Sequence, residues 1–120
     1  MPGNVNPGDA LYMAWRFDAA DGCSAGRMQD LLTRGERQKL YRLISWVVVD
    51  GEVRALLEPA APLEQIAAVV WKGSTKQVAS RWIASESACA AVTREIEISP
   101  VALGLAMRPE QWPYSSAAHG

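Results

Sequence analysis

The sequence predicts an α+β fold, a ferredoxin-like sandwich with an antiparallel sheet, from three observations. Residues 46–59 (WVVVDGEVRALLEP) read as two strands joined by Asp-Gly, a dipeptide that supplies the positive φ angles of a tight hairpin turn. A segment with strand alternation precedes this hairpin, and segments with helical spacing lie on both sides of it. The order strand–helix–strand–strand–helix, followed by another helix, is typical of that sandwich.

The composition fits one soluble globular domain. The chain has 120 residues, enough to bury about two-thirds of its unfolded surface. No apolar run approaches the ~20 residues that a membrane span needs, and the first ten residues lack the basic-then-apolar pattern of a signal peptide. We therefore expect a cytoplasmic protein with no membrane partner. Cys23 and Cys89 match neither a redox nor a metal spacing, so free thiols are expected.

The first half of the chain begins with an expected flexible tail, residues 1–8, which is rich in Pro, Gly and Asn. A single domain over residues 9–120 follows it. Asp9–Ala19 reads as the first strand, because its large apolar side chains fall on alternate residues. Residues 25–44 have helical spacing, with an offset near Gly35 that suggests a kink or two short helices.

The second half is less regular. Residues 63–72 have helical spacing, and residues 75–85 can continue as helix. A strand is the poorer alternative there, because its alternate positions mix Ser80 with Val78 and Trp82. The final strand of the sheet is therefore expected to be shortened or lost, which would expose the edge of the first strand.

The last segment combines a helix and a tail. Residues 86–98 have helical spacing, and Pro100 is expected to end this helix. Residues 100–120 contain further prolines and many small residues, so they should lie along the surface as a C-terminal tail. Its expected anchors are Leu103, Leu105, Trp112 and Tyr114.

The charge is small overall but unevenly placed. The formal net charge is −1, yet residues 24–45 carry five basic against two acidic side chains, and residues 60–84 carry three against one. A basic helix can contact phosphates even on a neutral protein, although such a face is more often simply solvated. The candidates for nucleic-acid contact are Arg27, Arg34, Arg37, Lys39, Arg42, Lys72, Lys76 and Arg81.

Glu52 and Arg54 lie two residues apart in the hairpin's second strand, so their side chains share one face. Their frame, Asp50-Gly51 before and Ala55–Pro59 after, resembles the most diagnostic strand of the insertion-sequence-200-like transposases, which include the REP-associated tyrosine transposases. In that family two histidines separated by one residue, the HUH pair, bind a catalytic divalent metal. Glu52 and Arg54 stand where those histidines would be.

A second stretch resembles the same family. Its members read close to Tyr-Ile-x-x-Asn-Pro-Val-x-Ala-Gly-Leu-Val, then Pro-Glu-x-Trp-Pro-Trp-Ser-Ser. This chain has EIEISPVALGLA from Glu95 and RPEQWPYSS from Arg108, so the resemblance covers residues 9–116. The family's tyrosine attacks a DNA phosphodiester with help from the metal. Glu95 stands in its place, and Ser99 where some members have a third metal ligand.

The resemblance implies a transposase-like protein with no intact catalytic residues; the vestigial positions are Glu52, Arg54, Glu95 and Ser99. Two carboxylates could hold the magnesium or manganese that the family uses. Arg54, however, places a fixed positive charge beside Glu52, and an ion pair of Arg54 with Glu52 or Glu95 is the simpler expectation. We therefore expect no metal or other cofactor. Tyr12 and Tyr41, in the predicted first strand and first helix, are not placed to replace the nucleophile.

Three functions remain open. The first is an inactive descendant of a DNA strand-transfer enzyme that binds hairpin or single-stranded DNA through its basic segments, with Trp71 or Trp82 either stacking on bases or packing in the core. The alternative is a homodimeric interaction module or gene remnant without nucleic-acid binding, which the near-neutral charge favours. The third is an enzyme that uses the replaced residues. The family is mostly homodimeric, and a dimer interface would include Met13, Trp15 and Phe17 unless they lie in the core.

Overall fold

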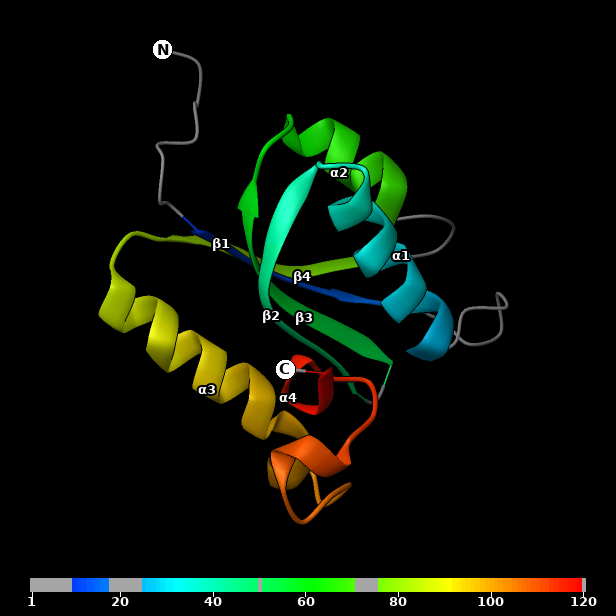
Figure 1. The fold of residues 1–120 in the computed structure, drawn as a ribbon, viewed down its shortest axis with the longest axis vertical. Helices are drawn as coiled ribbons and strands as arrows, with labels where there is room; N and C mark the ends of the chain where they lie inside the picture. Colours follow the sequence, from blue (N-terminus) through cyan, green and yellow to red (C-terminus); the bar gives the residue numbers. More distant parts are fainter. Residues whose placement is uncertain (1–9, 18–24, 50, 71–75, 120) are drawn as a thin grey trace.

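The computed structural model describes residues 10–17, 25–49, 51–70 and 76–119. The tail expected over residues 1–8 lies outside them, as do Cys23, Trp71 and Lys72. Four antiparallel strands form one sheet in the order β2-β3-β1-β4 (Figure 1). They are β1 (Ala10–Arg16), β2 (Tyr41–Val49), β3 (Glu52–Pro59) and β4 (Lys76–Ile83). This confirms the predicted α+β sandwich with an antiparallel sheet.

Helices cover both faces of the sheet. One apolar cluster joins the sheet to α1 (Ala25–Arg37) and α2 (Leu63–Val70), and it contains Met28, Leu32 and Ile66. A smaller cluster joins the opposite face to α3 (Glu86–Ala102) through Val92 and Ile96. Two short helices, η2 (Pro109–Gln111) and α4 (Ser116–His119), complete the chain near one end of α3 (Figure 1).

The hairpin is present as predicted. Val49 of β2 pairs with Glu52 of β3, and Gly51 in the turn has φ 74°, the left-handed conformation that glycine adopts without strain. Along β3 the side chains alternate between the two clusters. Val53, Ala55 and Leu57 pack on the α1 side, whereas Leu56 packs on the α3 side.

The helix expected over residues 25–44 is shorter than predicted. It ends at Arg37, Lys39 has φ 62°, and β2 already begins at Tyr41. Nor does Gly35 break the helix. A Cβ atom at Gly35 would lie 2.3 Å from the Tyr41 hydroxyl oxygen, so the glycine makes room for the phenol ring. The hydroxyl donates to the Leu32 carbonyl at 2.6 Å. Residue spacing alone could not predict that the helix ends at Arg37, because residues 40–44 fit both the helical and the strand period.

The final strand is neither shortened nor lost, so that expectation was wrong. Residues 76–83 form β4, which pairs with β1 over the length of both strands. Hydrogen bonding to β1 overrides the weak side-chain pattern, since an edge strand needs little alternation of its own. As a result β1 is a central strand, and Met13 and Trp15 are core residues with 3% and 0% exposure. Trp82 of β4 is 46% exposed.

The last helix is longer than expected, because α3 continues past Pro100 to Ala102. Proline removes one helical hydrogen bond, but the turn closes through the Leu103 N–H, which donates to the Ser99 carbonyl at 3.0 Å. Of the expected tail anchors, Trp112 and Tyr114 are half-buried against the two clusters. Leu103 and Leu105 are 47% and 45% exposed and do not anchor the tail.

Candidate functional site

A polar cluster joins β3 to α3 on the face of the sheet that α3 covers. Arg54 Nε donates to Glu52 Oε2 at 2.7 Å, and Arg54 Nη1 donates to Ser99 Oγ at 2.9 Å. Ser99 Oγ in turn donates to the Glu95 carbonyl at 3.0 Å. The fold therefore joins the side chains of Glu52 and Arg54 to that of Ser99 from a distant segment. Glu95 contributes its backbone carbonyl, while its side chain is exposed.

The cluster is partly shielded from solvent. The Glu52 side chain is 12% exposed and that of Arg54 is 33% exposed. The other oxygen of Glu52 faces Arg16 of β1, whose Nε lies 3.5 Å from Oε1 and whose side chain is 69% exposed. Arg54 thus forms its ion pair with Glu52. Charge-assisted hydrogen bonds of this kind are stronger than neutral ones, so they hold the guanidinium in place.

Tyr12 of β1 faces the same cluster. Burial raises the pKa of its phenol, and Glu52 and Glu95 act in the same direction, whereas Arg54 and Arg81 oppose them. The Arg81 guanidinium lies 5.3 Å from the centre of the Tyr12 ring, within the range of a cation–π contact. Sequence reasoning missed Tyr12 as a neighbour of the cluster. The alternation of β1 indicated which residues share its face, but only the pairing with β3 and β4 decides what lies beside them.

The side chains of this cluster suit an anion better than a metal ion. The described residues include no group of three or more His, Cys, Asp or Glu side chains that could hold a metal. Glu52 is the shielded carboxylate here, and both of its oxygens face arginines. A guanidinium repels a cation and binds phosphate oxygens, although Glu52 already neutralises part of this charge.

The candidate nucleic-acid contacts do not form one surface. Arg27, Arg34 and Arg37 are exposed on α1, and their spacing of seven and three residues places them on one side of the helix. We call them the α1 arginine stripe. Exposed Lys39 follows in the turn after α1, and Lys76 opens β4.

Two further candidates are engaged elsewhere. Arg42 of β2 forms an ion pair with Glu58 of β3. Arg81 lies over Tyr12, on the face of the sheet opposite α1. A ligand that contacts the α1 arginine stripe would therefore leave Arg81 on the far side of the sheet.

No described helix combines the length and the apolar character needed to cross a bilayer. No protein-family model matches the chain, and no curated protein matches its sequence. One solved structure is similar, that of a REP-associated tyrosine transposase bound to a REP hairpin, with a TM-score of 0.66 and 12% sequence identity. The likeness covers 93% of this chain and 78% of the transposase chain. The chain therefore has the fold of this transposase.

Proposed function

We propose that this protein is a catalytically inactive descendant of a DNA strand-transfer enzyme that binds hairpin or single-stranded DNA. The observation that carries the proposal is the convergence of Arg54, Glu52 and Ser99. The two sequence stretches that resemble the transposase family are more than 30 residues apart, and Glu52 and Arg54 of the first are hydrogen-bonded to each other and to Ser99 of the second. Glu95 takes part only through its backbone carbonyl, and its side chain is exposed. Such a convergence is expected of a fold inherited from that active site.

The chemistry of the cluster supports inactivity. A metal-assisted attack on a phosphodiester needs ligands for the cation and a nucleophile beside it. Here Arg54 and Glu52 satisfy one another, and Ser99 takes a further hydrogen bond from the guanidinium. Tyr12 is half-buried with a raised pKa, so its phenol stays protonated at neutral pH and is a poor nucleophile.

Retained DNA binding is supported by the α1 arginine stripe. Three exposed arginines along one helix provide phosphate contacts without any reading of bases. The similar transposase structure holds a REP hairpin, so a hairpin is the natural first ligand to test. The net charge of −1 means that binding must depend on this local surface and not on the charge of the whole protein.

The deciding experiment is a fluorescence-anisotropy titration of labelled hairpin, single-stranded and duplex DNA across a range of salt concentrations. We expect hairpin or single-stranded DNA to bind most tightly, with an affinity that falls steeply as salt increases. Absence of binding at low salt would reject DNA binding. It would favour the alternative of a protein-interaction module, which the near-neutral charge also suits.

Inactivity is tested separately with a nicking assay on single-stranded DNA. We expect no cleavage with magnesium or manganese, at protein concentrations that saturate binding. Cleavage that is lost on Glu95→Gln but kept on Glu97→Gln, a substitution on the same helix, would overturn the inactive assignment. It would indicate that the replaced residues still catalyse strand transfer.

A further inference from the structure

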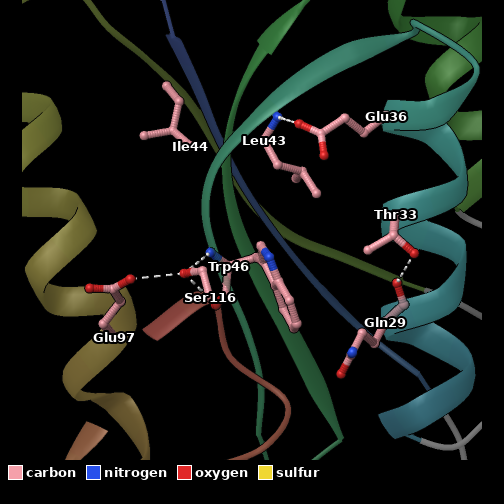
Figure 2. A pocket seen from close by; sticks show the side chains of 8 residues that line it. All are labelled: Gln29, Thr33, Glu36, Leu43, Ile44, Trp46, Glu97 and Ser116. Carbon is pink, nitrogen blue, oxygen red and sulfur yellow. Dashed lines mark hydrogen bonds between the residues drawn. The ribbon is translucent and has the colours of Figure 1, made fainter. Parts of the chain in front are cut away.

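A groove of about 410 Å³ crosses the β2 edge of the sheet between α1 and α3. Its volume falls in the range of about 300–1,000 Å³ that is usual for small-molecule sites. Figure 2 shows Leu43 and Trp46 of β2 in its centre, Glu36 of α1 on one side and Glu97 of α3 on the other. The groove shares no lining residue with the cluster around Arg54 or with the α1 arginine stripe.

Each of the two groove carboxylates is oriented by one hydrogen bond. Glu36 Oε2 accepts from the Leu43 N–H at 2.8 Å, and Glu97 Oε2 accepts from the Ser116 hydroxyl at 2.9 Å. An ionised carboxylate has two oxygens and about four lone-pair sites. Glu36 and Glu97 therefore keep most of their acceptor capacity for a ligand.

Neither groove carboxylate is neutralised within the part of the chain that the structure describes. The ion pairs among those residues all use the carboxylate of Glu52, Glu58 or Glu110. The described residues that line the groove include no arginine or lysine. A cleft whose charges have one sign concentrates ions of the opposite sign, so this groove attracts a cation.

The two charges lie on opposite sides of the sheet edge, because α1 and α3 cover opposite faces of the sheet. Apolar side chains lie between them. Leu43 packs with the cluster on the α1 side and Ile44 with the cluster on the α3 side, and both are half-buried. A ligand that meets both carboxylates therefore has to span the strand, with a charge near each end and an apolar stem between the charges.

We propose that the groove binds a linear aliphatic polyamine, with one ammonium group at Glu36 and another at Glu97. Alkyl ammonium groups, like that of lysine, are charged at neutral pH, and they form charge-assisted hydrogen bonds with carboxylates. The methylene stem lies over Leu43 and Ile44, where it removes apolar surface from water. This site goes beyond the proposed DNA binding and does not depend on it.

The test is an NMR titration of the full chain, without DNA, with three cations. Diaminooctane and diaminopropane, each with an amino group at both ends, carry the same charge but differ in stem length, and magnesium carries that charge without a stem. We expect diaminooctane to bind at least about tenfold more tightly than either, with amide shifts centred on residues 43–46. Equal affinity for diaminopropane or magnesium would overturn the proposal, and so would no binding of diaminooctane at millimolar concentration.

Matched variants assign the two ends of the site. Glu36→Gln and Glu97→Gln each remove a charge but keep an oxygen that accepts the hydrogen bond from Leu43 or Ser116. Each should weaken diaminooctane binding at least about tenfold, with unchanged far-UV circular dichroism. Glu86→Gln is the control of equal charge, since this exposed residue lies in the first turn of α3, outside the groove.

The proposal is overturned if either groove variant binds diaminooctane as the unmodified chain does, or if Glu86→Gln weakens binding as much. A peptide with two lysines presents the same ammonium groups on a protein backbone. Tighter binding of that peptide than of diaminooctane would also overturn the proposal, because it would indicate a protein partner for the groove.

Discussion

Arg54 of β3 and Ser99 of α3, 45 positions apart in the sequence, are joined by a hydrogen bond of 2.9 Å between Nη1 and Oγ. The same guanidinium holds Glu52, so one side chain links a strand, a helix and a carboxylate. Ser99 itself is 2% exposed. The helix that carries Glu95 and Ser99 is thus fixed to the sheet by polar contacts in addition to its apolar face.

Replacing Arg54 should therefore destabilise the fold. Arg54→Met keeps an apolar stem like that of arginine but leaves the shielded Glu52 carboxylate and the buried Ser99 hydroxyl without this donor. We expect a loss of about 1–3 kcal/mol in the free energy of unfolding, measured by urea denaturation. Arg16→Met is the matched control, since Arg16 is 69% exposed and its pair should contribute less than about 1 kcal/mol. Equal losses for both variants would contradict the central role of Arg54.

A methyl group at Gly35 should be poorly tolerated. The Cβ atom of Gly35→Ala would lie 2.3–2.7 Å from the hydroxyl oxygen and two ring carbons of Tyr41, a residue that is itself buried. Helix propensity alone would predict a gain, because alanine favours a helix interior over glycine. We expect a net loss of about 1–3 kcal/mol from overpacking, seen as a lower thermal midpoint. In a Tyr41→Ala background the same substitution should be neutral or stabilising, and a persistent loss there would exclude the ring contact as the cause.

Alkaline pH should destabilise the protein through Tyr41. Burial raises the pKa of its phenol, and the charge of Glu36 adds to the effect. In the unfolded chain the phenol ionises near pH 10, while in the folded chain it stays protonated to higher pH. This contribution to stability is complete below about pH 10 and is lost as the pH rises from there toward the folded pKa.

Denaturation curves above pH 10 measure this loss. Tyr41→Phe should reduce the slope of stability against pH. The slope should not vanish in the variant, because the pKa of Tyr12 is also raised by burial and its ionisation destabilises the folded chain at alkaline pH as well. At neutral pH the Tyr41→Phe variant lacks the hydrogen bond to the Leu32 carbonyl, so its free energy of unfolding should be lower by about 1 kcal/mol. An unchanged alkaline slope would show that Tyr41 ionises equally in both states.

The α1 arginine stripe should dominate DNA affinity. Arg34→Gln combined with Arg37→Gln removes two exposed positive charges, and we expect weaker binding with a salt slope reduced by roughly one to two. The control is Arg42→Gln combined with Arg108→Gln, which changes the net charge by the same amount. Both of these arginines already form ion pairs with carboxylates, so their loss should weaken binding less. Fluorescence anisotropy with hairpin DNA across salt gives both slopes. If the control pair weakens binding as much, net charge and not the stripe sets the affinity.

The sequence was sufficient where a signal is local. Asp50-Gly51 between two apolar runs predicted the hairpin, and the strand period placed Glu52 and Arg54 on one face. The turn dipeptide and the strand period are local signals, because each reflects the backbone preferences of residues only a few positions apart. The order of such elements was then enough to predict the sandwich, since few arrangements of this order bury all the apolar faces.

Features that depend on partners far apart in the sequence could be established only from the folded chain. Residues 76–83 are a strand because β1 offers a hydrogen-bonding edge, although their own pattern is ambiguous. Tyr12 lies beside Arg81 because the register of β1 and β4 pairs them. Gly35 packs against Tyr41 because the chain turns from α1 into β2 after Arg37. The hairpin, the Glu52–Arg54 pair on its second strand and the class of fold follow from local patterns of residues. Which side chains meet across strands and helices was decided by packing and pairing over long sequence separations, which no local period encodes.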